Sequence, residues 1–127
     1  MAKNSQKNHE LIVTENTDFQ IEEAGDYVFY IQKEGAELTV RGTFEVLGKD
    51  KKDVSVVIHH QAKHTRADTV LKGVARDQAG LKFTGRIIID EDCGDSHSFL
   101  TERILLLSPQ AHAEAVPDLE IKTDDVS

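Results

Sequence analysis

The first residues that could do chemistry are three closely spaced histidines. His59, His60 and His64 form the pattern H-H-x-x-x-H. In a strand, His59 and His60 would point to opposite faces, so both could ligate one ion only across a bulge. Zinc sites need three or four ligands, and the segment contains no Asp, Glu or Cys. We interpret the pattern as a polar strand end that runs into a loop.

A second cluster occupies the acidic segment 90–97, which contains Cys93 and His97. An EF-hand is excluded, because the Asp spacing is wrong and the glutamate expected at loop position 12 is missing. Cys93 and His97 could form half of a soft-metal site, or an activated thiol. The neighbouring carboxylates would raise the pKa of the thiol. We therefore predict that Cys93 is an exposed, unreactive thiol in a solvated turn.

The chain lacks the signatures of common active sites. It contains no G-x-S-x-G, G-x-x-x-x-G-K-[ST], G-x-G-x-x-G or H-E-x-x-H. The paired acids Asp124 and Asp125 lie near the C-terminus, where a solvated tail is the simplest interpretation. We predict that the protein is not an enzyme and has no intrinsic cofactor. The candidate metal ligands are His60, His64, Cys93, His97 and His112.

Composition limits the class of protein and its partners. The 127 residues include 15 Lys and Arg against 23 Asp and Glu, which gives a formal net charge of -8. This balance argues against nucleic acid as a partner, because phosphate binding needs clustered basic residues. No apolar run approaches the ~20 residues of a membrane helix, and the N-terminus lacks a signal-peptide core. One cysteine excludes an internal disulfide and fits a reducing cytosol, so we expect a cytoplasmic protein with no membrane contact.

The elements that must position these residues are strands. Runs of β-branched and aromatic residues alternate with clusters of Gly, Asp, Asn and Lys, and no stretch has a long helical period. We predict a disordered leader at 1–10 and one all-β domain at 11–127. The predicted strands cover residues 27–32, 38–47, 54–61, 67–75, 81–90, 99–107 and 119–122.

Two patterns bear on the kind of β fold. The motif apolar-x-Gly-x-apolar recurs around Gly42, Gly73 and Gly85, and glycine within a strand marks a bulge, a bend or a close backbone approach. This recurrence favours either the stacked turns of a solenoid or bends in a β-sandwich. Residues 105–107 are three consecutive leucines, which predicts a strand buried on both faces. Both folds would bury such a strand.

Four segments carry motifs that occur together in one family. Residues 60–74 read H-x-A-x-x-T, later followed by K-G, and residues 77–87 read D-x-A-x-x-x-F-x-G-x-I. Residues 105–113 read L-L-L-S-x-x-A-x-A, and residues 117–126 read P-x-L-E-I-x-x-D-D-V. In this order and spacing they resemble the SufB/SufD family, the scaffold subunits of SUF iron–sulfur cluster assembly, with detail closer to SufD. The family-motif positions are Thr65, Lys72, Gly73, Phe83, Gly85, Leu106, Leu107, Ser108, Pro117, Glu120, Asp124 and Asp125.

The resemblance implies a right-handed parallel β-helix and a scaffold without catalysis of its own, in which the motif positions are mostly structural. The implied partners are a SufB-like protein and a SufC-like ABC ATPase, or a second copy of the chain. An iron–sulfur cluster would be held only in such a complex. The family's Cys/Ser-His segment and docking helices would follow D-D-V, and its functional cysteine would align near Ala111. We therefore expect a truncated or reduced SufD-like core segment.

Two other functions remain open at this point. One is a small metal- or cluster-binding β module that uses the candidate His and Cys ligands. The other is a cupin-like enzyme in which His59, His60 and His64 face the interior of a barrel, although their spacing does not match a cupin metal motif well.

Overall fold

The described chain consists of nine strands in two parallel sheets. The computed structural model describes residues 8–122. Its elements are β1 (Asn8–Val13), β2 (Thr17–Ile21), β3 (Gly25–Ile31), β4 (Glu37–Val46), β5 (Lys51–His60), β6 (Arg66–Ala75), β7 (Gly80–Ile89), β8 (His97–Leu106) and β9 (His112–Ile121). One sheet has the order β1-β3-β5-β7-β9, and the other has the order β2-β4-β6-β8. No helix in this part of the chain could cross a membrane.

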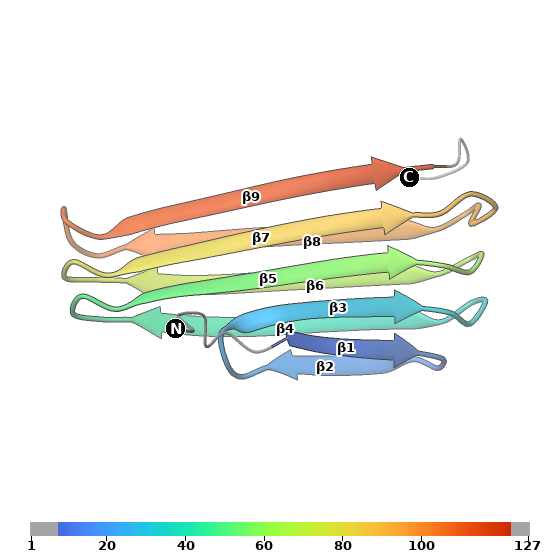
Figure 1. Ribbon diagram of the computed structural model, residues 1–127, viewed down its shortest axis with the longest axis horizontal. Coiled ribbons are helices and arrows are strands. Elements are labelled where there is room, and N and C mark those ends of the chain that lie inside the picture. Colours follow the sequence, from blue (N-terminus) through green and yellow to red (C-terminus); the bar gives the residue numbers. More distant parts are fainter. Residues whose placement is uncertain (1–7, 123–127) are drawn as a thin grey trace, which may run out of the picture.

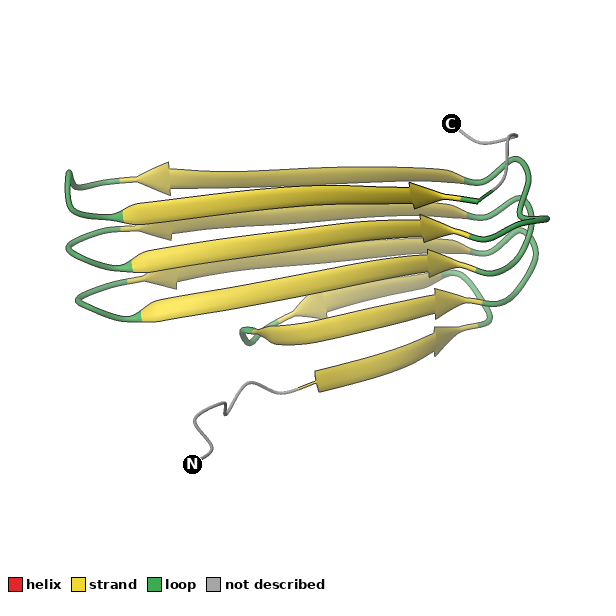
Figure 2. Ribbon diagram, turned by 45° about the horizontal axis from the view of Figure 1, so that its top comes forward, coloured by secondary structure: helices red, strands yellow, loops and turns green. Residues whose placement is uncertain are grey.

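The two sheets are the faces of a flattened solenoid. Each strand pairs in parallel with the strand two positions later, so the chain alternates between sheets as it rises (Figure 1). The register joins Lys51 to Gly80 and Gly80 to His112, which makes successive turns 29 and 32 residues long. The winding is right-handed, as expected for parallel crossovers, and the loops gather at the two ends of the strands (Figure 2). The prediction of an all-β parallel β-helix is confirmed, and the β-sandwich alternative is wrong.

The core lies between the sheets and follows from alternation along each strand. In β5, β6 and β7, every second side chain is buried over most of the strand. Phe29, Leu71 and Phe83 are among the largest fully buried residues. Branched and aromatic side chains suit this arrangement because they pack well on a pleated surface.

The recurring glycines make room for side chains that cross this core. A Cβ on Gly85 would lie 2.5 Å from Leu100 Cδ2 in the opposite sheet. A Cβ on Gly73 would overlap Leu81 Cδ2, again from the opposite sheet. These glycines lie within regular ladders, so they mark close approach between sheets rather than bulges or bends.

Several boundaries differ from the predicted ones. β1 begins at Asn8, because residues 8–10 pair with β3, so the predicted leader is three residues too long. The rest of that leader lies outside the described residues. The strand prediction also missed β1 and β2, which are short. β9 begins at His112 rather than at residue 119. Pro117 suggests a break in the strand, but β9 is an edge strand, and edge strands tolerate proline.

The prediction that residues 105–107 are buried on both faces is wrong. Leu105 is 59% exposed and Leu106 is 45% exposed. β8 is the last strand of its sheet, and no further turn of the described chain stacks on it. Leu105 points to the outer face of the sheet, whereas Leu106 faces inward and would need a further turn of the solenoid to cover it. Three consecutive leucines carry no information about either condition.

The two ends of the solenoid differ. Between the first rung, formed by β1 and β2, and β3 of the second rung, the rings of His9 and Tyr27 stack with centroids 4.5 Å apart, and Phe19 packs edge-on against Phe29. The strands there are short, with 6 residues in β1 and 5 in β2. At the last rung, β8 and β9 each have 10 residues, and neither has an outer neighbour within residues 8–122. We call this last rung the open end.

Candidate functional site

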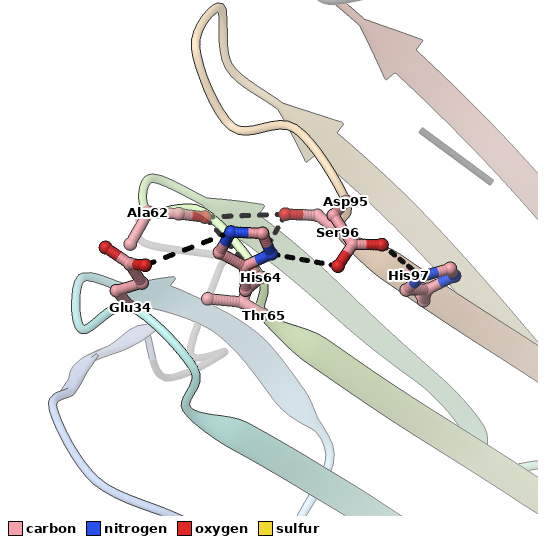
Figure 3. A network of polar contacts seen from close by, with 7 residues as sticks. All are labelled: Glu34, Ala62, His64, Thr65, Asp95, Ser96 and His97. Atoms are coloured by element: carbon pink, nitrogen blue, oxygen red, sulfur yellow. Dashed lines mark hydrogen bonds and ion pairs between the residues drawn. The ribbon is translucent and has the colours of Figure 1, made fainter. Parts of the chain in front are cut away.

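A column of polar side chains lies along the turns that follow β3, β5 and β7 (Figure 3). His64 Nδ1 is 2.8 Å from Asp95 Oδ2, and His97 Nε2 is 3.1 Å from Asp95 Oδ1. His64 Nε2 is 3.9 Å from Glu34 Oε2. Residues about one rung apart therefore meet, although they are remote in the sequence.

Stacked left-handed turns place these residues. Gly35, His64 and Asp95 occupy equivalent positions in three successive turns, with φ of 82°, 57° and 59°. Glycine adopts this conformation freely, and Asp and His adopt it more readily than most residues. The Gly35 amide donates to Lys63 O and the His64 amide donates to Gly94 O, both at 3.1 Å. A ladder of backbone hydrogen bonds thus holds the column in register.

Asp95 is the centre of this column. Hydrogen bonds from His64 and His97 hold the pKa of Asp95 below its usual value. The carboxylate accepts a hydrogen bond from each ring, which makes Nδ1 of His64 the donor and leaves Nε2 directed toward Glu34. All three side chains are substantially exposed to solvent. The arrangement can orient imidazole tautomers and exchange protons with water.

A buried polar group lies beside the column. His60 is fully buried, and its Nδ1 is 2.7 Å from Thr65 Oγ1, which is 3.1 Å from Ser96 Oγ. His60 Nε2 is also buried and has no hydrogen-bond partner within the described chain. Burial, and next the neighbouring His59, lower the pKa of His60 to about 4. His60 is therefore neutral at physiological pH.

The five candidate metal ligands do not form one site. His64 and His97 meet through Asp95 on the surface, whereas His60 lies in the core. Cys93 is buried elsewhere, and His112 is exposed at the start of β9. Within residues 8–122, no group of three or more His, Cys, Asp or Glu side chains could hold a metal ion.

The prediction that Cys93 is exposed is wrong. Its side chain is 3% exposed and packs with Ile87, Ile89 and Leu100. The turn between β7 and β8 is longer than the one between β5 and β6, and it buries the thiol. Burial raises the pKa of Cys93, and the charges of Asp90 and Asp92 add to the effect. The direction agrees with the prediction, although burial rather than the carboxylates is the main cause.

The family-motif positions occupy several environments. Thr65, Gly73, Phe83 and Gly85 are buried between the sheets. Ser108 Oγ donates to Asp77 O at 2.6 Å and so joins two turns at the other end of the strands. Other family-motif positions are exposed or part-exposed, either on the outer face of a sheet or at the open end: Lys72, Leu106, Leu107, Pro117 and Glu120. Asp124 and Asp125 lie outside the described residues.

The open end is the second candidate surface. A groove of about 320 Å³ lies between β7, β8 and β9, and Ile89, Leu100 and Leu119 line it. Leu119 is 58% exposed, and Leu106 and Ile121 are also exposed. No sequence pattern distinguishes this surface, because its residues have the same types as those of the buried core.

Together these features describe a parallel β-solenoid with polar turns and an apolar last rung that no further turn covers within residues 8–122. The family model for the SUF system FeS cluster assembly, SufBD core domain, matches residues 22–127, which include β3 through β9. The chain therefore belongs to the SufBD family, and its role lies in SUF iron–sulfur cluster assembly. The resemblance noted in the sequence is confirmed at the level of this family. A search of curated proteins finds no match.

Proposed function

We propose that the chain is a non-catalytic, SufD-like scaffold that binds another β-solenoid at its open end. The observation that supports this is the pair of uncovered ten-residue strands, β8 and β9, around an apolar groove. Uncovered edges offer backbone N–H and C=O groups that another strand can pair with. Exposed Leu106, Leu119 and Ile121 add apolar surface, which favours association.

The first rung is a poorer docking surface. Its strands have 6 and 5 residues, so they offer fewer backbone groups for pairing than the ten-residue strands β8 and β9. The contrast between the rungs therefore favours association through β8 and β9.

We infer that the partner is a SufB-like protein and that a SufC-like ABC ATPase joins the complex. The support is family membership, together with the SufD-like detail of residues 105–113 and 117–126. A second copy of the chain is the alternative partner. Iron–sulfur clusters are commonly held by several thiolates, and this chain has one cysteine, so cluster ligands would come from the partner as well. A single thiol also suits a reducing compartment, and we place the complex in the cytoplasm.

Co-purification of the full chain with SufB-like and SufC-like proteins from the same source tests this proposal. We expect a stable complex with the SufB-like protein that Leu119→Asp weakens, because the change puts a charge into the apolar groove. Ile12→Asp is the matched control, since Ile12 is equally exposed but lies in the first rung. Failure of both proteins to associate with the wild-type chain would contradict the proposal.

A further inference from the structure

One carboxylate faces the interior of the open end. Glu102 lies on β8 in register with the buried Leu71 of β6, so its side chain points between the sheets. Glu102 Oε2 is 2.9 Å from the position that a Cβ would take on Gly85, in the opposite sheet. The absence of a side chain at Gly85 thus leaves room for the carboxylate.

This carboxylate lacks a partner of opposite charge. Glu102 Oε2 is buried and makes no hydrogen bond within residues 8–122. Its inward-facing neighbours are apolar: Leu100 lies on the same strand, and Pro117 and Leu119 lie across the rung on β9. Arg103 follows directly but points to the outer face, because side chains alternate along a strand. A buried charge without a partner is unfavourable, and burial accordingly raises the pKa of Glu102.

Glu102 also lies at the centre of the end that would meet a partner. It is the sixth of the ten residues of β8, and Pro117, across the rung, is the sixth of the ten residues of β9. In a two-fold interface, the residues near the axis meet their own copies. Self-pairing of two open ends would therefore bring two inward-facing Glu102 carboxylates close together.

We propose that Glu102 selects the partner of the open end, disfavouring a second copy and favouring a partner that presents a Lys or Arg side chain at its centre. This inference rests on the proposed function, which is docking at the open end. Like charges that face each other across an interface oppose association, whereas a basic side chain supplies the interaction that Oε2 lacks. The exposed apolar residues of the open end, Leu106, Leu119 and Ile121, supply binding affinity for any partner. The charge of Glu102 determines which partner binds most tightly.

The test compares association constants of wild-type and Glu102 variants of the full chain by sedimentation equilibrium. We expect Glu102→Gln to self-associate at least about tenfold more tightly than wild type, because the opposing charges are gone. Glu102→Lys serves as a basic partner, so its mixture with wild type should associate at least about tenfold more tightly than either protein alone. All measurements use neutral pH and about 0.15 M salt, where exposed charges are screened.

Glu114 supplies the matched control, since it lies on β9 but is exposed on the outer face. Glu114→Gln and Glu114→Lys change the net charge equally and should leave self-association unchanged. Circular dichroism and urea unfolding verify that each variant folds, and Glu102→Ala gives a second neutral replacement.

Two further results separate this inference from the function on which it rests. Self-association of Glu102→Gln within about twofold of wild type, with no gain in the mixture, would overturn the role of Glu102. Docking itself would stand in that case, provided that a SufB-like protein still co-purifies with the chain. Absence of every association, including that with the SufB-like protein, would overturn both.

Discussion

Protonation of His60 should make the free energy of unfolding depend strongly on pH. His60 is fully buried with a pKa of about 4, whereas an unfolded histidine titrates near 6.5. As the pH falls from 6.5 to 4, the unfolded chain binds a proton at His60 and the folded chain does not. Stability attributable to His60 is therefore complete above pH 6.5 and is lost as the pH falls toward 4.

The size of this loss follows from the two pKa values. A difference of one pKa unit corresponds to about 1.4 kcal/mol between protonation states. Because proton binding is coupled to unfolding, the free energy of unfolding falls by about 2 kcal/mol between about pH 7.5 and pH 5, and by about 3 kcal/mol by about pH 4. This is a large fraction of the stability of an ordinary domain.

Urea unfolding of wild type and His60→Leu, followed by far-UV circular dichroism, measures the effect. At neutral pH the variant should be within about 1 kcal/mol of wild type, because Thr65 retains its contact with Ser96 and an unpartnered ring nitrogen is removed. At about pH 5 the variant should be more stable by about 2 kcal/mol. Carboxylate titration affects both proteins equally and cancels in the difference. His112→Gln, at an exposed site, is the control.

Parallel pH profiles for wild type and His60→Leu would refute this reasoning. The histidine would then be hydrated in the folded state, or it would move to solvent when it is protonated. In either case the buried contact with Thr65 would not describe the protein below neutral pH.

Three other changes test the packing. Gly85→Val should lower the free energy of unfolding by about 1–3 kcal/mol, because its side chain meets Leu100, and a loss below about 0.5 kcal/mol in urea would show that space exists. Leu71→Ala should cost about 2–5 kcal/mol and Leu105→Ala under about 1 kcal/mol, so equal costs would contradict a solvent-exposed outer face of β8. Cys93 should react with iodoacetamide slowly and with a midpoint above about pH 8.5, and rapid alkylation near neutral pH in the folded state would exclude a buried, protonated thiol.

The strands of the central rungs could be predicted because their pattern is local. Alternation of branched and polar residues in 54–58 and 81–87 defines both the strand and its inner face. The parallel solenoid needed more than alternation, since a sandwich uses the same pattern, and it was the series of family motifs that favoured the correct alternative. The register of β5, β7 and β9 pairs residues that are 29 to 32 positions apart in the sequence. No local sequence pattern determines that pairing.

Errors in the site predictions have one physical origin, the stacking of rungs. Cys93 has acidic neighbours in the sequence, which suggests an exposed position, but the longer turn after β7 places its side chain in the core. His64 and Asp95 are 31 residues apart in the sequence, and only the stacking of one rung on the next brings His64 Nδ1 to 2.8 Å from Asp95 Oδ2. The repeat of 29 to 32 residues between register partners is the signal for that contact, and the recurring glycines do not mark it, because Gly42 pairs with Leu71 rather than with Gly73.

Stacking also explains why one rung is suited to recognition. In a solenoid each rung contacts only its neighbours, so the inner face of a rung without an outer neighbour stays exposed until something covers it. The first rung has short strands, which offer few backbone groups for pairing. The last rung keeps full-length strands, exposes Leu119, and holds the unpaired Glu102 at its centre. Apolar surface alone would favour any covering partner, whereas a central carboxylate restricts the choice, and the combination has the properties of a selective interface.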